Sequence, residues 1–234
     1  MLKLKFTAFH PIKNIDLAER YLAGHRKVLE DYGVTNITTN SRGWLEMEHV
    51  YAIVVEDETG QLVGGVRMQM ADGVHQLPVE KAIGNMDARI YDIVKTYAGR
   101  GVGELCALWN AKSVAGYGIS VLLTMAGISI TNQVNCNTLM GICADYTLQM
   151  FKSVGFVVDN TLGIDGTFHY PSEDYKTRVL GILNSETLDT ALPEYQQIMM
   201  DLRNVPVQHR IETGPKGEIE IDYNLLMKDN SLKH

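Results

Sequence analysis

Residues 103–156 constrain the fold of this chain more than any other stretch. In order, they comprise a strand-like segment (103–112), a glycine turn at Gly116-Tyr117-Gly118, a long apolar segment (121–130), a second strand-like segment (139–145) and Met150-Phe-Lys-Ser-Val-Gly-Phe156. This order predicts a strand, a turn, a helix, a strand and a helix ended by glycine, which is a βαβα module. The glycines lie where a backbone can approach a phosphate.

Antiparallel strands are predicted before this module. Two β-branched runs, 50–56 and 62–70, flank the acidic turn 57–60 and predict a β-hairpin. The alternation of Leu2, Leu4 and Phe6 with polar residues predicts a first strand. Further expected elements are a helix over 16–32 that ends at Gly33, a loop over 35–45, and short helices near 79–83 and 88–97.

The C-terminal third is expected to continue with strands and one helix. Residues 157–163 and 167–182 are rich in strand-forming residues around a turn at 163–166. Ser185 is expected to open a polar helix over 186–203, with Pro193 as a break or a second start. A last hairpin is expected over 207–223. We therefore expect one main domain, 1–183, and an extension, 184–234, packed on it.

Composition excludes several function classes. The chain has 234 residues and a formal net charge of −7, which argues against a general binder of nucleic acid or anionic membranes. No apolar run reaches the ~18 residues that a membrane helix needs. The three cysteines and seven histidines show neither disulfide nor metal spacing. We expect a cytoplasmic protein without a metal.

The glycine turn alone allows two interpretations. Backbone N–H groups of a Gly-x-Gly between a strand and a helix can donate to a pyrophosphate, and the helix dipole favours the negative charge. The same pair can be a strand-to-helix corner that needs positive φ. A Rossmann site is disfavoured because the third glycine and the following acidic residue are absent. A P-loop is excluded because no Gly-Lys-Ser/Thr follows.

The order of elements resembles the GNAT acyltransferase fold. That resemblance implies an α/β (α+β) protein with a mixed, mostly antiparallel central sheet flanked by helices. Gly116-Tyr117-Gly118, with Lys112, Ile119 and Ser120, would bind the pyrophosphate of an acyl carrier, and the strand carrying Leu108, Trp109 and Asn110 would bond its pantetheine arm. Ser113 stands where the family usually has Gln or Arg.

A closer likeness is to the autoinducer (acyl-homoserine-lactone) synthases and related N-acyl amino acid synthases. Val63-Gly-Gly-Val-Arg67 resembles their hairpin strand, Glu104-Leu-Cys-Ala107 their Glu-x-Ser-Arg, and Arg26 their early arginine, while Glu46 or Glu48 stands near their acidic pair. Ala107 departs from the family arginine, and its early aromatic pair is not clear. Phe151 stands where many acetyltransferases have a tyrosine that acts as a general acid, and the autoinducer synthases also lack that tyrosine.

The resemblance implies transfer of an acyl group from acetyl-CoA, a longer acyl-CoA or an acyl carrier protein to the amine of a small molecule. Glu104 would deprotonate the amine, and Arg67 or Arg26 would orient the acceptor. The alternatives without a catalytic role are a surface or salt-bridged glutamate and a solvent-facing arginine. Cys143 with His169 is a weaker nucleophile candidate, and a buried structural cysteine is the better interpretation. Residues 184–234 could cover the acceptor side or form a homodimer contact.

Two other function classes stay open from the sequence. The same fold without turnover would be an acyl-CoA sensor or an interaction protein. A soluble α/β domain with no carrier site is the third interpretation.

Overall fold

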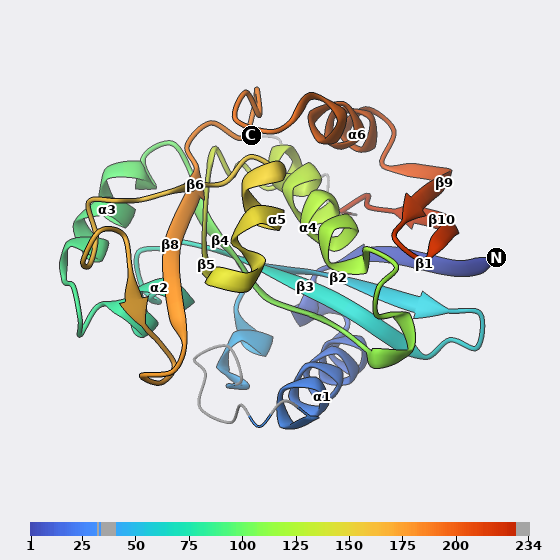
Figure 1. The fold of residues 1–234 in the computed structure, drawn as a ribbon, viewed down its shortest axis with the longest axis horizontal. Helices are drawn as coiled ribbons and strands as arrows, with labels where there is room; N and C mark the ends of the chain where they lie inside the picture. Colours follow the sequence, from blue (N-terminus) through green and yellow to red (C-terminus); the bar gives the residue numbers. More distant parts are fainter. Residues whose placement is uncertain (32, 34–40, 228–234) are drawn as a thin grey trace.

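The structure, a computed structural model, describes residues 1–31, 33 and 41–227. Its centre is a large mixed sheet with strand order β6-β8-β5-β4-β3-β2-β1-β10-β9, and β7 pairs with β8 (Figure 1). The strands are β1 (Leu2–Phe9), β2 (Val50–Asp57), β3 (Leu62–Met70), β4 (Val102–Asn110), β5 (Thr138–Ala144), β6 (Val157–Val158), β7 (Phe168–His169), β8 (Lys176–Ile182), β9 (Val207–Gly214) and β10 (Gly217–Asn224). Most pairs are antiparallel, while β4 with β5 and β1 with β10 are parallel. The predicted fold class is confirmed.

Six α-helices lie in the described part of the chain. They are α1 (Ile15–Asp31), α2 (Pro78–Ile83), α3 (Arg89–Ala98), α4 (Ile119–Ser129), α5 (Leu148–Ser153) and α6 (Pro193–Asn204). Short 3-10 helices are η1 (Pro11–Lys13), η3 (Gly43–Glu46), η4 (Lys112–Val114), η5 (Ile130–Gln133) and η6 (Asp145–Thr147). No described helix is long and apolar enough to cross a membrane.

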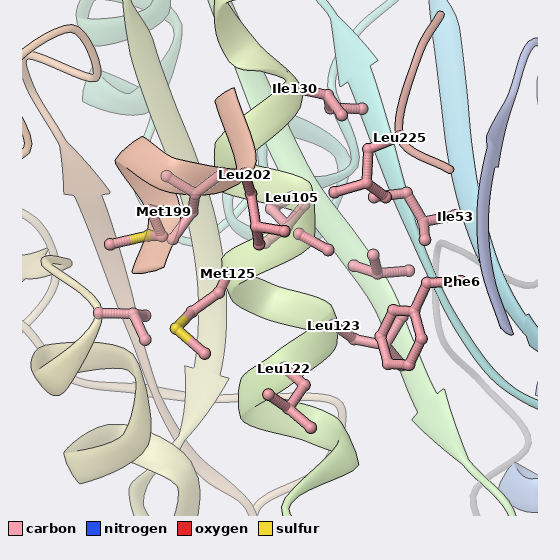
Figure 2. Packing of buried hydrophobic residues seen from close by; sticks show 14 of the residues in the cluster. Phe6, Ile53, Leu105, Leu122, Leu123, Met125, Ile130, Met199, Leu202 and Leu225 are labelled. Carbon is pink, nitrogen blue, oxygen red and sulfur yellow. The ribbon is translucent and has the colours of Figure 1, made fainter. Parts of the chain in front are cut away.

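The largest apolar core lies between the sheet and α4. Every residue of α4 from Leu122 to Ser129 is buried, which explains why its apolar residues show no single face. Leu105 of β4 and Leu122 and Leu123 of α4 pack with Met199 and Leu202 of α6 (Figure 2). These residues form one layer over one face of the sheet.

The opposite face carries two smaller cores. One joins α1 to β2 and to Trp109, and includes Tyr21, Leu22 and Trp44. The other joins α2 and α3 to Val102 of β4 and to Met140. Because side chains alternate along a strand, Val102 and Glu104 point to this face while Gly103 and Leu105 point to α4. Glu104 therefore lies on the face that carries α1, α2 and α3.

Four details differ from the sequence-based expectation, three of them in the C-terminal third. The strand expected over 167–182 is two strands joined by a turn, and only 157–158 of the expected 157–163 is a strand. The helix expected from 186 begins at Pro193, because proline lacks an N–H and fits the first helical turn, whereas Leu192 before it is extended. Of the loop expected over 35–45, residues 35–40 lie outside the described residues, and Gly43–Glu46 forms a 3-10 helix.

The C-terminal hairpin extends the central sheet. Strand β10 pairs in parallel with β1, from Leu2 opposite Ile219 to Thr7 opposite Asn224, and β9 pairs outside it. The turn between β9 and β10 is thus held at a fixed place relative to the rest of the sheet. The division at residue 183 stays a prediction.

Candidate active site

The candidate site begins where β4 and β5 separate. These parallel strands pair at Val102, Gly103 and Glu104, the last of which lies opposite Met140, and the pairing ends there. Beyond that point β4 continues to Asn110 against β3, and β5 continues to Ala144 against β8. One edge of β4 is therefore without a strand partner from Leu105 onward, and its backbone groups are available to a ligand.

A β-bulge lies in this part of β4, in its pairing with β3. Arg67 pairs with Cys106 and Gly65 with Trp109, so that one residue of β3 opposes two of β4, Ala107 and Leu108. Ala107 has φ of +50°, which a non-glycine residue rarely adopts. The N–H of Ala111 donates to Val63 of β3, and alternation then directs the N–H groups of Leu108 and Asn110 away from β3. These donors face the side from which β5 has separated.

Glu104 is buried at the point of separation. Its side chain is 2% exposed, and its Oε2 accepts a hydrogen bond of 2.6 Å from the N–H of Val79 at the start of α2. Burial raises the pKa of Glu104 to about 8, although the Val79 N–H and the positive charge of Arg67 lower it. A carboxyl with such a pKa exchanges its proton near neutral pH, which is what a general base requires. A purely structural role, in which Glu104 caps the start of α2, would account for only one of its two carboxylate oxygens.

Arg67 lies on β3 opposite Cys106, two positions along β4 from Glu104, and is also 2% exposed. Its Nε donates to Cys106 Sγ at 3.3 Å, and its guanidinium carbon stands 4.7 Å from the centre of the Trp44 ring. Its buried Nη1 has no hydrogen-bond partner among the described residues. Arg67 is therefore not the solvent-facing arginine that the sequence also allowed. A buried guanidinium with an unused donor is suited to a carboxylate ligand.

Aromatic residues of α1 and η3 enclose this arginine. Tyr21 contacts Trp44 and Trp109 edge to face, with ring centres 5.7 and 6.1 Å apart. His25 stacks on Tyr21 and is 2% exposed. Burial, with Arg67 and Arg26 nearby, lowers the pKa of His25 to about 4, so its ring adds no second positive charge beside Arg67 at neutral pH.

Sequence reasoning missed these aromatic residues. Trp44 stands in a polar segment that was expected to be a loop, yet it is 2% exposed. A lone tryptophan in such a segment is a usable signal, because large aromatic rings are mostly buried. Tyr21 and His25 carried only the signal of helical spacing.

The glycine turn leads from β4 to α4 and has the conformation that was expected. Gly116 and Gly118 have φ of +84° and +80°, and Gly118 is the N-cap of α4. Among the described residues no acceptor is found for the backbone N–H groups of Gly116, Gly118, Ile119 and Ser120. The hydroxyl of Ser120 donates to Asn110 Oδ1 at 2.6 Å and ties the helix to the end of β4. Four free donors at a helix N-terminus favour an anion.

The cation nearest this turn is not the one expected from the sequence. Lys112 Nζ lies 3.6 Å from Asp31 Oδ2 at the end of α1. Lys216, from the tip of the C-terminal hairpin, lies against the turn instead. A Cβ on Gly116 would be 2.7 Å from Lys216 Cε and 3.3 Å from its Nζ. The same ammonium stands 5.7 Å from the centre of the Tyr117 ring and has no carboxylate partner in the described part of the chain.

Other candidate residues lie apart from this arrangement or are structural. Arg26 is half-buried on α1 and acts on His25, but it is not among the groups that shift the pKa of Glu104. Glu46 and Glu48 are exposed. Cys143 is buried with its pKa raised to about 11, as in a structural cysteine. No group of three or more potential metal ligands occurs among residues 1–31, 33 and 41–227.

Phe151 is a core residue, and two cavities lie away from Glu104. Phe151 is buried edge to face with Phe156, their ring centres 5.3 Å apart, so no tyrosine hydroxyl is present at this place in α5. Cavities of about 470 and 520 Å³ lie elsewhere, one around Arg100 and Arg203 and the other around α5. Neither contains Glu104 or the glycine turn.

Comparison with solved structures identifies the fold. No protein-family model and no curated protein matches the sequence. An N-acyl amino acid synthase from uncultured soil microbes, FeeM, has a TM-score of 0.60 and 14% identity, over 84% of this chain and 99% of that chain. A CoA-dependent acyl-homoserine lactone synthase, BjaI, has a TM-score of 0.53 and 12% identity, over 96% and 97%. An acyl-CoA N-acyltransferase from Pseudomonas aeruginosa has a TM-score of 0.53 and 12% identity, over 76% and 98%.

Proposed function

The chain has the GNAT fold, near the autoinducer-synthase branch, and on this premise we propose that it is an N-acyltransferase. It would transfer an acyl group from a CoA thioester to the amine of a small molecule that carries a carboxylate. The observation that carries the proposal is that Glu104 and Arg67 are both buried next to the point where β4 and β5 separate, with Arg67 near enough to lower the pKa of Glu104. The neighbour BjaI was solved with isopentyl-CoA, which supports CoA as the donor.

The donor would lie along the free edge of β4. Its pyrophosphate would accept hydrogen bonds from the four free N–H groups of the turn at 116–120, with Lys216 as the nearest cation. The pantetheine arm would bond the outward backbone groups of Asn110 and the outward carbonyl of Leu108. A strand N–H near Leu108 would then stabilise the oxyanion of the tetrahedral intermediate.

The acceptor would approach from the face that carries α1 and α2. The unused Nη1 of Arg67 would bind its carboxylate, since no described side chain satisfies that donor. Glu104 would take the proton of the amine as it attacks the thioester carbon, directly or through a water. With phenylalanine at 151, the thiolate of CoA would leave without a tyrosine acid and take its proton from solvent. An acyl carrier protein remains a second possible donor.

A thiol-release assay tests this proposal. Acyl-CoAs of increasing chain length are combined with amino acids and with the matching amino acid amides. We expect thiol release that depends on the amine, a preference for the acid over the amide, and loss of turnover in Glu104→Gln with CoA binding intact. Arg67→Gln should abolish the preference for the acid over the amide, a ratio that does not depend on how much protein is folded.

A matched pair of glycine variants tests the phosphate turn. Gly116→Ala should weaken CoA binding, because alanine rarely adopts φ of +84°. Gly73→Ala is its control, since Gly73 has φ of +74° in a turn outside the site and has no atom near its Cβ position. Equal CoA affinity in both variants would exclude the carrier site. Binding without thiol release, unchanged by Glu104→Gln, would instead identify an acyl-CoA sensor.

A further inference from the structure

The β-bulge in β4 depends on an unusual backbone conformation at Ala107. Its φ of +50° is one that alanine adopts rarely, and no glycine relieves the conformation there. The Ala107 carbonyl and the Leu108 N–H belong to one planar peptide unit. The backbone conformation of Ala107 therefore sets the direction of the Leu108 N–H. If Ala107 returned to an ordinary strand conformation, the Leu108 N–H would turn away from the free edge of β4.

One side chain holds the bulge from outside the strand. The Tyr21 hydroxyl donates a hydrogen bond of 2.6 Å to the carbonyl oxygen of Ala107. Tyr21 belongs to α1 and stands 86 positions earlier in the chain. The bond therefore fixes the same peptide unit, Ala107–Leu108, whose N–H faces the free edge.

The surroundings of Tyr21 leave its ring little freedom. It is fully buried, and Trp44 and Trp109 contact it edge to face. Gly65 of β3 leaves room for the ring, because a Cβ there would lie 2.6 Å from the tyrosine Cε2. Burial raises the pKa of Tyr21 well above its usual value, so the hydroxyl remains a donor at every working pH.

We infer that Tyr21 is a positioning residue, which holds the Ala107 carbonyl so that the Leu108 N–H stays aimed at the acyl carbonyl of the donor. This inference rests on the proposed acyl transfer. Tyr21 does not touch the reacting atoms; it acts through the bulge. The hydrogen bond and the packing of α1 thus stabilise the positive φ of Ala107, a conformation that glycine would adopt without strain.

Kinetics of Tyr21→Phe give the first test. Loss of one oxyanion donor costs about 10²–10³ in kcat, so a partly misaligned donor should cost about 10- to 100-fold, with KM for the acyl-CoA unchanged. Tyr21→Phe/Ala107→Gly should recover about tenfold, because glycine adopts positive φ about as readily as negative φ. Tyr223→Phe is the matched control: its buried hydroxyl has no partner among the described residues, and we expect wild-type kcat.

A labelling experiment gives a test that needs no turnover. The dipeptide Ala-Leu occurs twice in the sequence, at 107–108 and 191–192. Protein labelled with ¹³C at the alanine carbonyl and ¹⁵N at leucine therefore shows two correlations, one from the bulge and one that serves as an internal reference. Tyr21→Phe should shift the 107–108 signal and leave the 191–192 signal in place.

The same signals report on the ligand. A CoA analogue in which a methylene replaces the thioester sulfur keeps the carbonyl and cannot react. Its addition should shift the Leu108 N–H downfield in the wild type and shift it less in Tyr21→Phe.

The outcomes separate the two claims. An unchanged kcat in Tyr21→Phe, a double variant no better than the single one, or an unmoved 107–108 signal would each overturn the role of Tyr21. Absence of thiol release by the wild type with every acyl-CoA and amine would refute the proposed function, and the labelled signals would still decide whether Tyr21 holds the bulge.

Discussion

The protonation of Glu104 makes a quantitative prediction about stability. Its pKa is about 8 in the folded protein, against a reference value of 4.5. Between these two pH values the unfolded chain has lost the proton while the folded protein keeps it. The free energy of unfolding should therefore fall by ~1.4 kcal/mol per pH unit in this window, to a total of ~5 kcal/mol. The raised pKa costs stability at high pH, and no penalty exists below pH 4.5.

The variant Glu104→Gln removes the titration and keeps the shape of the side chain. Denaturant unfolding, followed by tryptophan fluorescence at pH 5 to 9, gives the free energy of unfolding for each protein. The value for the wild type minus that for Glu104→Gln should become more negative by ~1.4 kcal/mol per unit from pH 5 to 8 and then level off. Because the pKa of His25 is lowered to about 4, His25 makes the folded protein more stable as the pH rises from 4 to the pKa of the unfolded chain. This contribution is equal in the two proteins and cancels in the difference.

Glu58→Gln is the matched control, because Glu58 is exposed in the turn between β2 and β3. Its curve should run parallel to that of the wild type. If Glu104→Gln also runs parallel to the wild type, the carboxyl is ionised in the folded protein at pH 5. Burial would then be outweighed by its partners, Val79 and Arg67, and our reasoning about a base near neutral pH would be wrong.

Three further predictions follow from the site and its packing. The kcat/KM for the amine should rise with pH to a midpoint near 8, since Glu104 must be ionised to act as a base, and a flat profile would exclude it from that role. Lys216→Gln should raise the Kd of CoA about 3- to 10-fold and weaken its salt dependence, while exposed Lys5→Gln changes neither, as titration calorimetry at two salt concentrations would measure. Gly65→Ala should destabilise the fold by ~1–3 kcal/mol through overlap with a tyrosine ring of α1, whereas Gly43→Ala, with nothing near its Cβ position, should have little effect in thermal unfolding.

Much of the fold was accessible from the sequence because local patterns set it. The hairpin of β2 and β3, the βαβα module and the last hairpin each follow from alternation, helical spacing and turn residues within one stretch. The start of α6 at Pro193 was open, since a proline can break a helix or begin one. The break within 167–182 was missed, although Pro171, Ser172 and Asp174 stand between the two strand-forming tyrosines and are typical of turns.

The candidate site was only partly predictable. Glu104 and Arg67 could be named because their segments resemble motifs of the autoinducer synthases, and the turn at 116–118 because of its two glycines. The burial of Glu104 and Arg67 could not be predicted, because it depends on α1, α2 and η3 covering one face of the sheet. Lys112 was named for the phosphate turn from its position in sequence, but its ammonium lies beside Asp31.

By itself, the sequence determined the order of strands and helices and the glycines that give the turn before α4 its positive φ. These are short-range properties of backbone conformation and side-chain periodicity. Only the tertiary structure decided that β4 and β5 separate after Glu104, that Tyr21 reaches the Ala107 carbonyl, and that Lys216 lies on a glycine turn about a hundred positions earlier. Such contacts join segments distant in sequence, and they form because the sheet and its covering helices must bury their apolar faces together.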